Sequence, residues 1–347
     1  MMKGRRSFSK LPFLVSALIF PESSDKFLKK RAAYVCNLDA CSVTEIDIKK
    51  RDWARNIPVG MYPVFSFIHP HSPEKLLVTL HNYNLKENEG FLVLVDLKAG
   101  RVLQKIAYPG VSVPSGFAYD KKRDVIYVAD ENLDKIYAHN GTTLELLSSM
   151  VAGSKTVHLD VSASGRWLAA TNRFGADLSV YDLEASGVER AHAVSIPLRE
   201  SRASRCHPYD IKFTSIPDFC CVTDFAAGQL LIVDMVNRQV IHRVNVAKQL
   251  FGLELNRARD TAYVCTWDRG TVAVIDLVQK KKIGEIDGFK GYTSHCALDE
   301  ASHQLVVTSQ TDGGAGETRI VDLRTGSVGP AIRDEIMQGC IGVTIEE

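Results

Sequence analysis

Six ionisable residues recur at alternating positions within short apolar segments of this 347-residue chain: His158, Asp160, Asp210, Lys212, Glu254 and His295. In an extended strand every second side chain faces the same side, so the apolar residues between them face the other side. Histidine titrates near neutral pH, and a nearby carboxylate can orient it as a general base. If the fold brings His158, Asp210 and His295 together, they could therefore perform acid/base catalysis.

A repeated pattern indicates which elements position these residues. An apolar segment that ends in an acidic residue recurs around Asp47, Asp96, Asp182, Asp234, Asp276 and Asp322, with Asn140 in the same place of a seventh copy. The copies follow one another about every 45 residues, which is the length of a four-stranded propeller blade. Each copy contains a short strand a, a strongly apolar strand b, the strand c with the Asp and a strand d. The sequence therefore predicts an all-β fold, a seven-bladed β-propeller of four-stranded blades.

The two ends of the chain are predicted to share one blade. Residues 340–347 resemble a strand a with no strand after it, whereas residues 31–58 resemble strands b, c and d with no strand a before them. Joining the two segments closes the ring and removes exposed sheet edges. An alternative assignment uses residues 12–20 as the missing strand a, but it leaves the C-terminal strand without a place.

Strands a line the central channel of a propeller. The alternation predicts that Phe65 and Phe67 face the blade core, and that the channel is lined by Val64, Ser66, Gly116, Ala118, His158, Asp160, Asp210, Lys212, Gly252, Glu254, His295, Ala297, Gly342 and Thr344. In this arrangement His158, Asp210 and His295 lie nearest the channel mouth. The deeper layer of Asp160, Lys212 and Glu254 is either an ion-pair network that ties blades together or part of the site, because burying such charges is costly unless they are paired or solvated.

The d–a and b–c loops are expected to rim the same mouth. Their candidate substrate-binding residues are Asn82, Asn172, Arg173, His207, Asp224, Trp267, Asp268, Arg269 and Tyr292. Polar groups among aromatic rings suit a small organic ligand with an anionic or polar group, which the two arginines could clamp. The alternative is that these loops are polar only because water surrounds them. A divalent metal held by His158, His207 and His295 is a further alternative, although no ligand spacing in the sequence supports it.

Two repeat units carry a resemblance to a known group of propellers. The units GFAYDKKRDVIYVADENLDKIYAHN and GLELNRARDTAYVCTWDRGTVAVIDLVQKKKIGEI resemble YVTN-type repeats. That group overlaps the lactonase-like and cytochrome-cd1-like seven-bladed propellers, and the resemblance covers residues 31–347. It implies the fold. Because the group includes lactonases, lyases, cofactor-bearing domains and non-catalytic binding modules, activity has to be argued from the site.

Two functions follow from these observations. The first is an enzyme, a hydrolase, lyase or isomerase that acts on a small polar or lactone-like metabolite at the channel mouth. The alternative is a non-catalytic propeller that binds a ligand or a protein partner on the same face, which the absence of a P-loop, a GxSxG or an HExxH motif favours. A net charge of +1 and the lack of a basic-aromatic stripe argue against nucleic acid as the partner. No apolar run reaches the roughly 18 residues of a membrane span. The protein is expected to be a monomer.

The N-terminal segment and the cysteines bear on the compartment. Residues 1–30 are predicted to be an arm or a signal-like segment ahead of a propeller over 31–347, because basic residues precede the apolar stretch 11–20 without a good cleavage site after it. The eight cysteines lack zinc-type spacing and are expected to be buried free thiols, which favours the cytoplasm over export. Cys36 and Cys41 are the one pair that could face each other across a turn.

Overall fold

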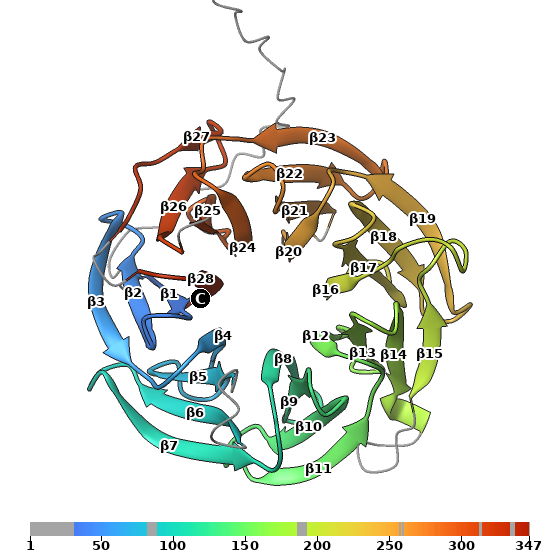
Figure 1. Cartoon of the computed structure of the whole chain (residues 1–347), viewed down its shortest axis with the longest axis horizontal. Helices are drawn as coiled ribbons and strands as arrows, with labels where there is room; N and C mark the ends of the chain where they lie inside the picture. Colours follow the sequence, from blue (N-terminus) through green and yellow to red (C-terminus); the bar gives the residue numbers. More distant parts are fainter. Residues whose placement is uncertain are drawn as a thin grey trace, which may run out of the picture. The chain divides into compact units, whose positions relative to one another are not determined.

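Seven four-stranded antiparallel sheets surround a common axis in the computed structural model (Figure 1). The structure describes residues 31–81, 89–185, 193–256, 258, 260–311, 314–333 and 337–346. The predicted N-terminal arm, residues 1–30, lies outside the described residues. The all-β, seven-bladed prediction is confirmed.

Six blades are each made of four consecutive strands. Their bounds are β4 Pro63–Ile68, β5 Lys75–Leu80, β6 Gly90–Asp96 and β7 Arg101–Tyr108; β8 Pro114–Asp120, β9 Val125–Asp130, β10 Lys135–Asn140 and β11 Leu146–Val151; β12 Thr156–Val161, β13 Trp167–Asn172, β14 Asp177–Asp182 and β15 Val194–Pro197; β16 Pro208–Phe213, β17 Phe219–Asp224, β18 Gln229–Asp234 and β19 Gln239–Asn245; β20 Leu250–Leu255, β21 Thr261–Thr266, β22 Thr271–Asp276 and β23 Lys281–Ile286; β24 Tyr292–Asp299, β25 Gln304–Gln310, β26 Gly316–Asp322 and β27 Ser327–Val328. In each blade the first strand lies nearest the axis (Figure 1).

The seventh blade joins the two ends of the chain, as the repeat pattern predicts. Strand β28 (Cys340–Ile345) pairs antiparallel with β1 (Ala32–Asn37), and β2 (Ser42–Asp47) and β3 (Asp52–Pro58) complete the sheet. The pairing places Ala33 opposite Ile345 and Val35 opposite Val343. The C-terminal strand therefore holds the innermost place that the alternative assignment gave to residues 12–20.

The recurring acidic residue closes the turn between strands c and d. In blade β16–β19, Oδ1 of Asp234 accepts hydrogen bonds of 2.9 Å from the backbone N–H groups of Val236 and Asn237. Asp96 accepts a similar bond from Ala99. An Asp side chain that bonds the backbone two or three residues later fixes a tight turn. The residue that reveals the repeat in the sequence is thus structural.

The hydrophobic core lies between neighbouring blades. Strand b is apolar on both faces because both faces are covered, and in β17 Cys220, Cys221 and Val222 are fully buried. Val222 packs in one cluster with Leu178 of the preceding blade, which holds the two sheets together. All eight cysteines are free thiols, so Cys36 and Cys41 form no disulfide. No helix among the described residues is long and apolar enough to cross a membrane.

The register of β4 differs by one residue from the predicted register. In blade β12–β15, the Thr171 hydroxyl donates to the carbonyl oxygen of the channel-facing His158 at 3.2 Å. The equivalent Thr79 of blade β4–β7 donates to the carbonyl oxygen of Phe65 at 3.4 Å. Since a shift of one residue moves every side chain of a strand to the other face, Phe65 rather than Val64 faces the channel. The prediction that Phe65 faces the blade core is wrong.

Glycines let adjacent inner strands approach each other. A Cβ atom on Gly342 would lie 2.4 Å from the Val64 carbonyl oxygen and 3.0 Å from the Phe65 ring, and Gly116 and Gly252 face the next strand in the same way. We expect Gly342→Ala to lower the free energy of unfolding by about 1–3 kcal/mol, because backbone atoms must move to admit the methyl group.

Chemical denaturation of the purified protein measures this loss. The matched control is Gly284→Ala, whose Cβ would meet only the Val274 side chain at 3.8 Å. The control should stay within about 0.5 kcal/mol of the wild type. Equal losses in the two variants would contradict the close approach of the inner strands.

Candidate functional site

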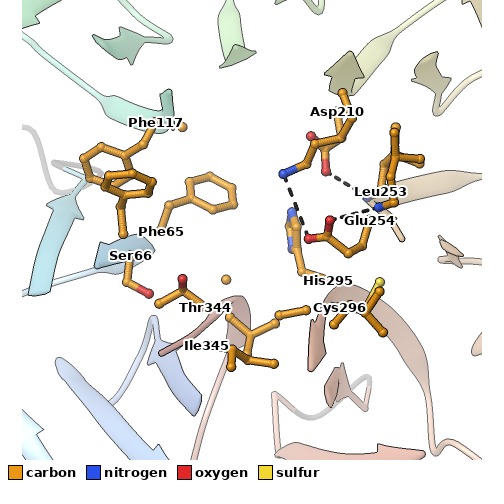
Figure 2. Close-up of a pocket in the computed structure, with 18 of the residues that line it drawn as sticks. Phe65, Ser66, Phe117, Asp210, Leu253, Glu254, His295, Cys296, Thr344 and Ile345 are labelled. Carbon is orange, nitrogen blue, oxygen red and sulfur yellow. Dashed lines mark hydrogen bonds and ion pairs between the residues drawn. The ribbon is translucent and has the colours of Figure 1, made fainter. Parts of the chain in front are cut away.

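A cavity of about 690 Å³ lies on the axis of the ring, and strands a of all seven blades line it. The six ionisable residues predicted to face the channel all line this cavity. At one end it reaches His158, Asp210 and His295, and at the other it reaches Asn256 and Ala301 in the a–b turns. Figure 2 shows Phe65 projecting into this space from one side, and Asp210 and His295 from the other.

His158, Asp210 and His295 form a compact cluster at the inner end of the cavity. Nδ1 of His158 lies 3.4 Å from Oδ1 of Asp210. One nitrogen or oxygen atom from each of the three residues lies within 4.8 Å of those of the other two. The three side chains come from β12, β16 and β24, so only the closed ring brings them together.

The Asp210 carboxylate is buried and firmly oriented. Its Oδ1 accepts a 2.8 Å hydrogen bond from the Ile211 N–H, and its Oδ2 accepts one of 2.8 Å from the Leu253 N–H of the next blade. Burial raises the pKa of Asp210 above its ordinary value, although the Lys212 charge and both N–H groups act in the opposite direction. A carboxylate with a raised pKa is a better proton acceptor than one in water.

Both histidines are neutral at physiological pH. Burial lowers the pKa of His158 and of His295 to about 3. Nε2 of His158 and both ring nitrogens of His295 have no hydrogen-bond partner of good geometry, although the Ile341 carbonyl is near enough to oppose the fall in the pKa of His295. Such weakly basic rings are poor general bases near pH 7, but their lone pairs are free to bind a cation.

Aromatic rings cover the inner end of the cavity. The Phe65 ring stands edge-on to His158 and His295, with centroid distances of 4.5 and 5.2 Å. The Tyr209 ring lies 5.1 Å from His158 and stacks at 3.8 Å on Phe251. These rings lie on the side of the d–a and b–c loops. The cavity therefore extends towards the a–b turns, the end opposite to the predicted mouth.

The deeper layer is partly an ion-pair network, as one of the two interpretations predicts. Nζ of Lys212 lies 4.0 Å from Oε2 of Glu254. Oδ2 of Asp160 accepts a 2.7 Å hydrogen bond from the Phe213 N–H of the next blade. The whole lining is acidic, since its charged groups are Arg31, Lys212, Asp160, Asp210, Glu254, Asp299, Glu300 and Glu346. Six carboxylates against two cations favour neutral or cationic ligands over anions.

Several predicted substrate-binding residues hold the rim loops in place through hydrogen bonds and ion pairs. Asn172 bonds Thr156, Asp177 and Ser179 through its amide group. Oδ1 of Asp224 accepts bonds from the backbone of His207, Ala226 and Ala227, and the Asp268 carboxylate accepts bonds from the backbone of Lys248 and Gln249. Arg269 pairs with Glu285 at 3.6 Å. Asn82 lies outside the described residues.

The other predicted rim residues form an aromatic surface. The indole of Trp267 stacks on Tyr292 at 4.5 Å and contacts Phe251 at 4.9 Å. The Arg173 guanidinium lies 5.9 Å from the Tyr209 ring centroid. His207 contacts the exposed Phe174 ring at 6.0 Å and is not part of the His158 cluster. None of the predicted rim residues that the structure describes lines the axial cavity.

Phe65, Tyr209 and Phe251 also belong to the site, although the sequence pattern does not place them there. Each lies at or one residue before a channel-facing position. The strand-b threonines provide a signal that aligns the blades, because Thr79, Thr171 and Thr308 each bond the carbonyl oxygen of a channel-facing residue. Aligning the inner strands on these threonines would have identified Phe65.

Comparison with known proteins supports the class of propeller that the repeats indicate. The model of the family "Lactonase, 7-bladed beta-propeller" matches residues 95–249. A functionally unknown protein from Desulfotomaculum acetoxidans DSM 771 is 13% identical with a TM-score of 0.70, over 90% of this chain and 98% of its own. The β-propeller domain of Cps50 (Swd1) from Myceliophteria thermophila is 13% identical with a TM-score of 0.63, over 78% of this chain and 86% of its own.

At 13% identity these two structures show a shared fold alone. No curated protein matches the chain in sequence. The family match and the structural likeness together confirm the resemblance to the lactonase-like seven-bladed propellers.

Proposed function

We propose that the axial cavity is the active site of an enzyme that hydrolyses small uncharged lactones or esters. The observation that carries this proposal is the buried Asp210 carboxylate, which has a raised pKa and faces a cavity of about 690 Å³. Cavities of a few hundred Å³ hold small metabolites. The match to the lactonase family model favours hydrolysis over elimination or isomerisation.

Asp210 acts as the general base in this proposal. It takes a proton from a water molecule as the water oxygen attacks the carbonyl carbon of the lactone. When the ring C–O bond breaks, the protonated Asp210 returns that proton to the leaving alkoxide, and the product is a hydroxy acid. The Lys212 ammonium lines the same cavity and supplies positive charge for the oxyanion that forms on the carbonyl oxygen.

The acidic lining sets the substrate class. Six carboxylates and two cations line the cavity, so a phosphate or carboxylate on the substrate would meet repulsion there. We therefore expect uncharged sugar lactones and simple esters to react faster than their phosphorylated counterparts. Steady-state rates on matched pairs of lactones with and without a phosphate measure this preference.

A cavity-filling variant tests where the reaction occurs. Thr344 projects into the cavity from β28 (Figure 2). We expect Thr344→Trp to lower kcat/KM by at least ~100-fold because the indole displaces the substrate. Thr344→Val keeps the volume and should retain activity. Unchanged kcat/KM in a folded Thr344→Trp variant would contradict the cavity as the active site.

The second candidate function is ligand or partner binding on the aromatic rim. The contact chain from Tyr209 through Phe251 and Trp267 to Tyr292 favours it, because aromatic clusters are frequent in binding surfaces. In this alternative Trp267→Ala weakens binding and Thr344→Trp has no effect. The lactonase proposal predicts instead that Thr344→Trp abolishes most of the activity and that Trp267→Ala has little effect.

A further inference from the structure

Three donor groups meet where the cavity ends. The nitrogen and oxygen atoms that His158, Asp210 and His295 offer lie within 4.8 Å of one another. Donors around a tetrahedral ion at ~2.1 Å lie ~3.4 Å apart. The His158 Nδ1 to Asp210 Oδ1 distance is already 3.4 Å. Because no two of these donors lie more than 4.8 Å apart, side-chain movements of about 1.4 Å or less would bring all three to coordination distance.

The unpartnered ring nitrogens also point to a ligand. The His295 side chain is more than nine-tenths buried, and neither of its nitrogens has a hydrogen-bond partner of good geometry. Nε2 of His158 is also buried without a partner. Buried polar atoms in folded proteins are normally satisfied. An imidazole nitrogen without a hydrogen-bond partner can offer its lone pair to a cation.

The surroundings suit a cation with an open coordination position. The Ile211 and Leu253 N–H groups fix the Asp210 carboxylate, as second-sphere hydrogen bonds fix metal ligands. Phe65 and Tyr209 cover the cluster on one side, and the acidic cavity lies on the other. Three protein ligands leave a position for water that faces the substrate space.

We propose that His158, Asp210 and His295 bind one divalent transition-metal ion, of which Zn²⁺ is the representative, at the inner end of the axial cavity. The catalytic use of this ion rests on the proposed function, whereas the binding site rests on the cluster alone. The ion would lower the pKa of a bound water molecule and polarise the carbonyl group of the lactone. Asp210 would then serve as a ligand rather than as the base. The bound water would release a proton to the surrounding water and supply the attacking hydroxide, and the leaving alkoxide would take up a proton from water.

Direct metal binding tests the site without any substrate. The full chain is treated with a chelator and titrated with Zn²⁺ by calorimetry and with Co²⁺ by visible absorption. We expect one ion per chain, and an affinity that falls at least ~100-fold in His295→Gln and in Asp210→Asn. His242→Gln, a change outside the cavity, is the matched control and should bind as the wild type does.

Several outcomes would overturn the inference. These are no binding, unchanged affinity in His295→Gln, or a loss of affinity through His207→Gln instead. If His295→Gln does not fold, the Co²⁺ spectrum of the wild type decides, because the weak absorption of a six-coordinate aqua-like ion would exclude the three-ligand site. Equal lactone hydrolysis with and without metal would overturn the catalytic use and leave the proposed hydrolase. If the protein binds metal but hydrolyses no lactone or ester, the proposed function is overturned and the proposed metal-binding site stands.

Discussion

Asp210→Asn is expected to lower kcat for lactone hydrolysis by about 10³-fold, because loss of a general base typically costs 10²–10⁴-fold. Asparagine has almost the same shape but cannot take a proton from water. In the metal-assisted form of the mechanism the loss of kcat has a different cause, because asparagine is a weaker metal ligand than aspartate. Stopped-flow or pH-stat rates at saturating lactone measure the effect. A loss of less than about 10-fold would contradict the role of Asp210.

A matched control separates catalysis from folding in this experiment. Asp210 accepts hydrogen bonds from its own neighbour, Ile211, and from Leu253 of the next blade. The Asp160 carboxylate accepts equivalent hydrogen bonds from the N–H groups of Val161 and of Phe213 in the next blade. Asparagine at either position turns an NH₂ group towards a backbone N–H, which costs about 1–3 kcal/mol. Asp160→Asn should therefore lose similar stability but keep kcat within about 10-fold of the wild type.

The metal-free protein is expected to lose stability steeply between pH 6.5 and pH 5. Burial lowers the pKa of His81, His158 and His295 to about 3. Between pH 6.5 and that value the unfolded chain binds protons at these sites that the folded chain does not. The three buried histidines therefore cost the folded protein no stability above pH 6.5. Below pH 6.5 the free energy of unfolding falls, because the unfolded chain gains protons that the folded chain cannot bind. The raised pKa of Asp210 acts in the opposite direction, because above pH 3.8 the folded chain binds a proton there more readily than the unfolded chain does, and it offsets part of the loss.

The expected loss is large compared with the stability of a typical protein. Each histidine contributes about 1.4 kcal/mol per pH unit, so at pH 5 each costs about 2 kcal/mol and the three together about 6 kcal/mol. Native proteins are stable by only about 5–15 kcal/mol. Urea denaturation at pH 7 and pH 5, with chelator present, measures the difference.

A single variant assigns this acid sensitivity to the buried histidines. His81→Gln removes one of the three groups and leaves the axial cluster untouched. It should reduce the loss of stability between pH 7 and pH 5 by about 2 kcal/mol. The same loss in the variant and the wild type would show that His81 is protonated or exposed in the folded protein.

The fold could be predicted from the sequence because its signal is local and repeated. Asp234 and its equivalents close the c–d turns through their own neighbours, so the pattern survives in every blade. The apolar strands b, such as Phe219–Asp224, are recognisable because both of their faces are buried. Closure by β28 follows from counting strands. None of these inferences needs a long-range side-chain contact.

The accessible end of the channel could not be predicted in the same way. Alternation placed His158, Asp210 and His295 on the channel face, and the structure brings them together there. Which end of the channel stays open depends on how Phe65 and Tyr209 pack across the ring. That packing depends on contacts between blades far apart in the sequence, and a one-residue difference in β4 was enough to hide it.

The most direct test of the axial site is a crystal structure of the protein with an uncharged analogue of its best lactone that resists hydrolysis, such as the corresponding lactam. We predict that the analogue occupies the cavity beside Asp210 and His295 and is reached from the a–b turns. An analogue stacked on Trp267 and Tyr292, with the axial cavity holding only water, would contradict the axial site and establish the aromatic rim as the binding surface.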